Sequence, residues 1–72
     1  MAATKTGNSS HDSAMLIAEN TRQVAISGSP TAAQVRAADI AWARAGQASA
    51  KANGIAPGQF VSMLQELGTG GS

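Results

Sequence analysis

Residues 31–52 read TAAQVRAADIAWARAGQASAKA, an alanine-rich segment with the composition of an α-helix. Within it, small residues recur at every fourth position: Ala33, Ala37, Ala41, Ala45 and Ser49. On a helix this spacing lays small side chains in a nearly continuous strip, and such a strip lets another backbone come close. The segment therefore predicts a long helix that packs against other helices.

Both ends of this helix carry strong signals. Thr31 and Gln34 fit a capping box, in which each side chain accepts the backbone N–H of the other residue. At the other end, Gly54 supplies a left-handed residue, and Ile55 is placed to fold back onto the last turn. The sequence thus predicts a helix over 32–52.

The residues on each face of this helix follow from the rotation of 100° per residue about the helix axis. One direction holds Val35, Ala38, Trp42 and Ser49, with the small residues beside them. The opposite side holds Arg36, Arg44, Gln47 and Lys51. Ile40 lies among these polar residues, either as scattered surface or as part of a second contact face. Gly46 marks either a close approach beside Trp42 or a kink.

A helix is also predicted on each side of this segment. The first runs over about 12–27 with Asp12 or Ser13 as N-cap, and Gly28 and Pro30 end it. Its apolar residues lie on more than one side.

The last helix covers about 57–67, with Pro57 in its first turn. Phe60, Leu64 and Leu67 have the spacing of a buried stripe. The chain is then all-α, with a polar flexible arm over 1–11, one small helical domain over 12–68 and a glycine-rich tail over 69–72.

Length and composition bound the possible functions. A chain of 72 residues with one Phe, one Trp and no Tyr has a poor core, so we expect it to oligomerise or to dock on a larger protein. It has no Cys, and five basic against four acidic residues select no charged partner. No signal peptide or membrane span is recognisable, so we expect a location in the cytoplasm or within an assembled particle.

No catalytic, cofactor or metal site is predicted. His11 and Asp12 lie near three serines, but a catalytic triad needs a rigid scaffold, and helix capping or a solvated arm explains these residues better. A single His and scattered carboxylates do not form a metal site. Asp39 lies three residues from Arg36 and is interpreted as its ion-pair partner on the helix surface.

Three interpretations remain, and the first is preferred. It is a non-enzymatic structural or assembly subunit, such as a head, neck or tail component of a virion, whose interface holds the strip, Trp42 and the stripe formed by Phe60, Leu64 and Leu67. The second is a helix-turn-helix module that binds DNA, although the helix after the turn has no Lys or Arg. The third, an amphipathic helix on a membrane surface, lacks bulky apolar residues opposite its basic face.

Overall fold

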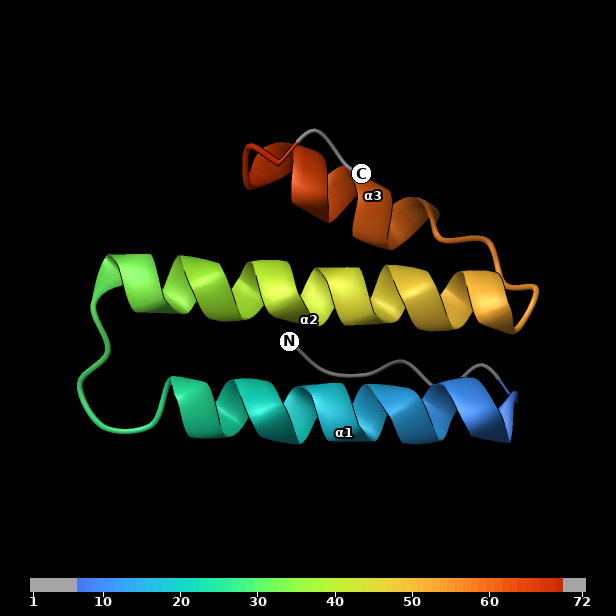
Figure 1. Cartoon of the computed structure of the whole chain (residues 1–72), viewed down its shortest axis with the longest axis horizontal. Helices are drawn as coiled ribbons and strands as arrows, with labels where there is room; N and C mark the ends of the chain where they lie inside the picture. Colours follow the sequence, from blue (N-terminus) through green and yellow to red (C-terminus); the bar gives the residue numbers. More distant parts are fainter. Residues whose placement is uncertain (1–6, 70–72) are drawn as a thin grey trace.

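The structure is a computed structural model that describes residues 7–69, and within this range it contains three α-helices and no strand (Figure 1). They are α1 (Ser9–Ala25), α2 (Ala32–Ala52) and α3 (Gly58–Glu66). Helix α2 lies between the other two and contacts both; α1 and α2 run antiparallel along most of their lengths. The molecule is flat, with principal extents of 35 × 25 × 14 Å. The predicted all-α class is confirmed.

Helix α1 begins three residues before the predicted start. Its N-cap is Asn8, whose side chain accepts a hydrogen bond from His11 N at 3.0 Å. The predicted caps, Asp12 and Ser13, lie inside the helix. Asn caps a helix as well as Asp or Ser does, and the first turn is held in place by burial of His11. Residues 9–11 therefore belong to α1, while 1–6 of the predicted arm lie outside the described residues.

Helix α2 has the predicted bounds and caps. Thr31 N donates to Gln34 Oε1 at 2.8 Å and Gln34 N donates to Thr31 Oγ1 at 3.1 Å, which is the complete capping box. At the C-terminus Gly54 has a φ of 69°, and Ile55 N donates to Ala50 O at 2.8 Å. This bond and the left-handed Gly54 form the Schellman ending that the sequence predicts. Ile55 packs against the core.

Helix α3 agrees with its prediction within a residue at each end. Pro57 is its N-cap residue and Gly68, with a φ of 82°, follows its end. The sequence predicts Thr69 in the tail, but both its backbone N and its hydroxyl donate to Leu64 O at 3.0 Å. Thr69 thus closes the last turn of α3, and residues 70–72 lie outside the described residues.

All three helices contribute to one small core. Its buried members are Met15 from α1, Trp42, Ala43 and Ala50 from α2, and Phe60 and Leu64 from α3. The Trp42 and Phe60 rings lie 5.5 Å apart between centroids. Gly46 is the point of close approach: a Cβ there would lie 2.2 Å from the Phe60 ring. Ile40 packs against the core as well, so it belongs to a second contact face of α2.

Candidate interaction surface

The strip of small residues on α2 does not form one contact face. Ser49 is half-buried against α1, whereas Ala33, Ala37, Ala41 and Ala45 are all exposed. A spacing of four residues turns by about 40° per step on a helix with 3.6 residues per turn, so the strip winds around α2 by about 160°. One neighbouring helix can cover only part of such a strip. The prediction that these residues contact another protein stays a prediction.

The other predicted interface residues lie inside the chain itself. Trp42, Phe60 and Leu64 are buried where the helices meet, and Leu67 is half-buried. The backbone O of Leu67 accepts a hydrogen bond from the guanidinium of Arg36. The stripe of α3 therefore anchors this helix on α2 of the same chain.

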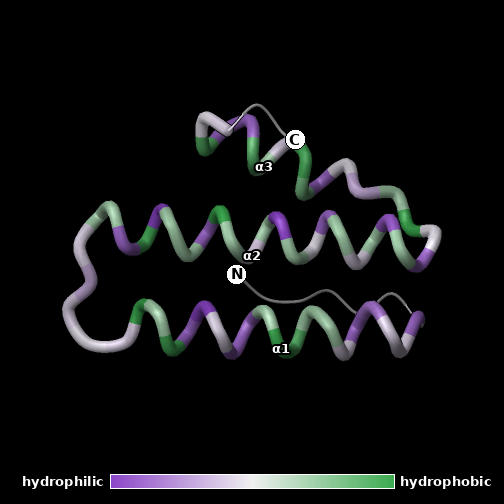
Figure 2. The backbone as a smooth tube through the Cα atoms, in the orientation of Figure 1, coloured by the Kyte–Doolittle hydropathy of each residue, from purple (hydrophilic) through white to green (hydrophobic). Residues whose placement is uncertain are grey.

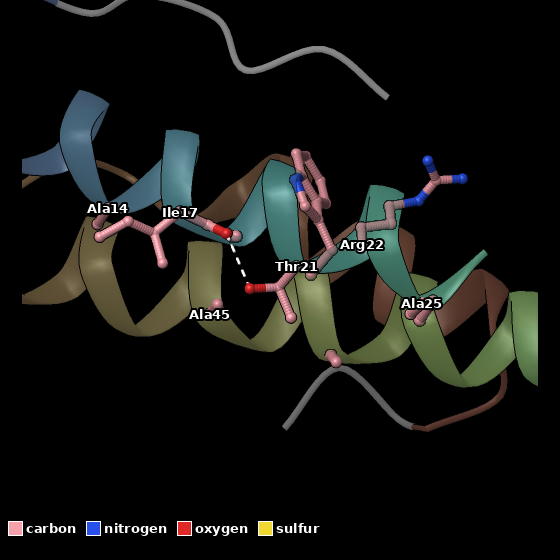
Figure 3. A pocket seen from close by; sticks show the side chains of 10 residues that line it. Ala14, Ile17, Thr21, Arg22, Ala25 and Ala45 are labelled. Carbon is pink, nitrogen blue, oxygen red and sulfur yellow. Dashed lines mark hydrogen bonds between the residues drawn. The ribbon is translucent and has the colours of Figure 1, made fainter. Parts of the chain in front are cut away.

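An apolar groove of about 230 Å³ follows the seam between α1 and α2 (Figure 3). From α1 it is lined by Ala14, Ile17, Ala18, Thr21, Arg22 and Ala25. From α2 it is lined by Ala38, Ala41, Trp42 and Ala45. Alanines on both helices make the groove, because their short side chains leave the seam unfilled on this face.

Large apolar side chains of α1 remain exposed. Ile17, in the wall of the groove, is 68% exposed, while Val24 is 75% exposed and Leu16 is 60% exposed. Figure 2 shows the same distribution, since hydrophobic positions occur on turns of α1 that face away from α2. The sequence indicated that α1 is apolar on more than one side, and α2 covers only one of them. Sequence reasoning nevertheless missed the groove, because its α1 half depends on the register between two helices.

The groove carries little charge. Arg22 borders it, and Arg22 Nε forms an ion pair with Asp39 Oδ1 at 2.7 Å, with both side chains largely buried. The predicted pair of Asp39 with Arg36 is wrong, because Arg36 reaches across to α3 instead. Three residues apart on a helix, two side chains can meet, but a partner on a packed neighbouring helix offers a better-shielded contact. The remaining lining residues are uncharged.

His11 is buried rather than part of a solvated arm. The residue is 3% exposed, its Nδ1 lies 2.8 Å from Ser49 Oγ, and its ring centroid lies 6.2 Å from that of Phe60. A Ser–His hydrogen bond also occurs in nucleophilic catalysis. Here the ring is enclosed between helices, and its contact with Ser49 joins α1 to α2. The antiparallel register that pairs Arg22 with Asp39 also pairs His11 with Ser49, and no local motif reveals it.

None of the helices within residues 7–69 is long and apolar enough to cross a membrane. No three His, Cys, Asp or Glu side chains in that range are grouped so that they could hold a metal ion. A scan against protein-family models gave no match for this chain, and neither did searches of curated proteins and solved structures.

Proposed function

We propose that this protein is a non-enzymatic structural or assembly subunit that packs into a larger complex through the α1–α2 face. The observation that carries the proposal is the apolar groove between these helices, with Ile17 and Val24 exposed along α1. Large contiguous apolar surfaces on small proteins mark interaction sites more often than scattered single residues do. A virion, in its head, neck or tail, is one assembly with places for such small accessory chains.

The energetics favour a partner. Burial of an exposed Ile or Val contributes about 1.5–3 kcal/mol, so Ile17 and Val24 together represent several kcal/mol that the isolated chain does not gain. Among residues 7–69 the core has six buried hydrophobic members in contact, and two of them are alanines. Small domains are marginally stable, and association is one of the usual means of supplying the missing burial.

DNA binding by a helix-turn-helix is the alternative function, and the geometry gives it less support. Helix α3, which would read the bases, exposes Gln59, Ser62, Gln65 and Glu66 and contains neither Lys nor Arg. Arg36 on α2 is engaged with Leu67 O. Phosphate contacts from Lys and Arg supply most of the affinity for DNA, so a reading helix without cations is a poor candidate.

The test is the size of the complex that contains this chain in the cells that make it. A tagged chain is extracted, treated with nuclease and separated by size in 0.1 M and 1 M NaCl. We expect it to elute in a protein complex far larger than one chain at both salt concentrations, because apolar packing does not weaken with salt as phosphate contacts do. Elution as a free single chain at both concentrations would refute the proposal. Loss of the complex on nuclease treatment would support DNA binding.

A further inference from the structure

We infer that the groove between α1 and α2 binds a second copy of this chain, in a two-fold arrangement of two α1–α2 hairpins. The inference deepens the proposed function, on which it rests, by naming the first partner of the interaction surface. Two hairpins placed face to face make a four-helix arrangement, a common way for amphipathic helices to bury an apolar face. Two features of the surface, together with its size, favour this occupant.

The first feature is that the surface holds both protruding and hollow parts. Ile17 protrudes from α1, whereas Ala41 and Ala45 of α2 leave a hollow beside it. An interface between identical copies uses the same patch twice, so its patch has to be complementary to itself. A face with large and small apolar side chains next to each other meets this condition. A second copy can place its Ile17 in the alanine-lined hollow and receive the same side chain in return.

The second feature is the absence of free charge in the groove. Arg22 is its one charged lining residue and is neutralised by Asp39 at 2.7 Å. Two copies therefore meet without repulsion between like charges. The lining offers no ion pair to an acidic or basic peptide, and an uncharged apolar surface such as the groove itself is the matching occupant.

The size of the face is sufficient for a small dimer. The 17 residues of α1 extend about 25 Å, and two packed helices are about 20 Å across. The face then covers about 500 Å² on each copy and about 1,000 Å² in total, close to the lower limit for a specific interface. A dimer in equilibrium with single chains at micromolar concentration is the expected result.

The test compares two charged variants on one helix. Ala41 lines the groove and Ala37, one turn away on α2, does not, and both are exposed. The substitutions Ala41→Glu and Ala37→Glu therefore change helix propensity and net charge equally, and circular dichroism checks that both variants stay helical. The mass of the purified chain is measured by sedimentation over a concentration series.

We expect wild type and Ala37→Glu to reach twice the mass of one chain, and Ala41→Glu to dissociate at least about tenfold more readily because a buried charge opposes association. The indole N–H of Trp42, the only Trp in the chain, should give one NMR signal that shifts with concentration in wild type but not in Ala41→Glu. A wild-type chain that stays single at high concentration, or equal dimerisation of Ala41→Glu, would overturn the inference.

A cysteine experiment locates the contact independently. The chain has no Cys, so Ile17→Cys on the groove and Gln23→Cys, an exposed residue of α1 outside the groove lining, each introduce a single thiol. Mild oxidation should link Ile17→Cys chains in pairs much faster than Gln23→Cys chains; equal rates would count against the two-fold contact.

If the purified chain is single but Ala41→Glu removes it from the large cellular complex, the second copy is excluded and the proposed function stands. If the chain is also free and single in cells, both the dimer and the proposed function are refuted.

Discussion

At the scale of single residues, the absence of a side chain at position 46 fixes how closely α3 approaches α2. The Phe60 ring occupies the space in which a Cβ of residue 46 would lie, at 2.2 Å. Gly in a helix costs about 1 kcal/mol relative to Ala, so the position keeps Gly against its helix propensity. The close approach was one of two meanings that the sequence left open for Gly46, and the other was a kink.

Gly46→Ala should destabilise the fold. Overpacking costs about 1–3 kcal/mol, against a gain of about 1 kcal/mol in helix propensity, so we expect a net loss of up to about 2 kcal/mol in the free energy of unfolding. Gly58→Ala is the matched control, because no heavy atom lies within 4 Å of a Cβ there, and it should be neutral or slightly stabilising. Adding Phe60→Leu to Gly46→Ala should cost less than the two single losses combined. Strict additivity would show that the ring does not limit position 46.

The His11–Ser49 hydrogen bond is a second contact of single residues that stabilises the hairpin. Ser49→Ala leaves Nδ1 of the buried ring without its partner, so we expect a loss of about 1–2 kcal/mol in the free energy of unfolding. Ser62→Ala, on the exposed face of α3, should change stability by less than about 0.5 kcal/mol. If the two variants are equally stable, His11 does not depend on Ser49.

At the scale of elements, the structure differs from the sequence prediction in the residue at which α1 begins. Helix α1 begins at Ser9 under the Asn8 cap, and this extension is what brings His11 to Ser49 near the C-terminal end of α2. A start at 12 would leave His11 outside the helix and would remove this contact between α1 and α2.

Asn8→Ala should therefore destabilise α1 by about 1 kcal/mol, the usual cost of losing a capping side chain. The measurement is unfolding followed by circular dichroism, together with amide exchange at His11, whose N–H the Asn8 side chain accepts. Asn20→Ala, exposed in the middle of α1, is the control and should be neutral or stabilising because Ala has the higher helix propensity. A neutral Asn8→Ala with a costly Ser13→Ala would place the start where the sequence predicted it.

At the scale of the whole molecule, the flat arrangement of three helices explains why apolar surface remains exposed. Helix α2 has a neighbour on two sides, whereas α1 packs along α2 and meets α3 only where the His11 ring lies against Phe60, among residues 7–69. A helix of 17 residues packed along one neighbour cannot bury a broad apolar arc, and so Leu16, Ile17 and Val24 stay exposed. The groove is a consequence of this arrangement together with the alanines on both walls.

If two copies bind through the groove, thermal stability should depend on concentration, because association stabilises the folded chain only. A tenfold increase in concentration is worth about 1.4 kcal/mol per dimer, or about 0.7 kcal/mol per chain. For a domain of this size it should raise Tm by about 3–6 °C. The measurement is circular dichroism at two concentrations, and Ala41→Glu should show a much smaller rise. A Tm independent of concentration in wild type would contradict dimerisation.

The sequence by itself determined the three helices, both caps of α2, the turn at Gly54 and the apolar stripe of α3 that contains Phe60 and Leu64. These features depend on local backbone preferences and on apolar spacing within one helix, and both can be read from neighbouring residues. The sequence prediction for Asp39 was wrong because the ion-pair partner of Asp39 lies on another helix, and a pattern within one helix does not reveal it.

Only the tertiary structure decided which parts of the small-residue strip are covered. The strip winds about α2, and the direction in which α1 packs makes Ser49 a contact of α1 and leaves Ala41 and Ala45 open to the groove. The burial of His11 and the Arg22–Asp39 pair depend on the same antiparallel register. Such a register is set by the packing of two whole faces, with contacts separated by up to 38 positions in the chain, and no local pattern specifies it.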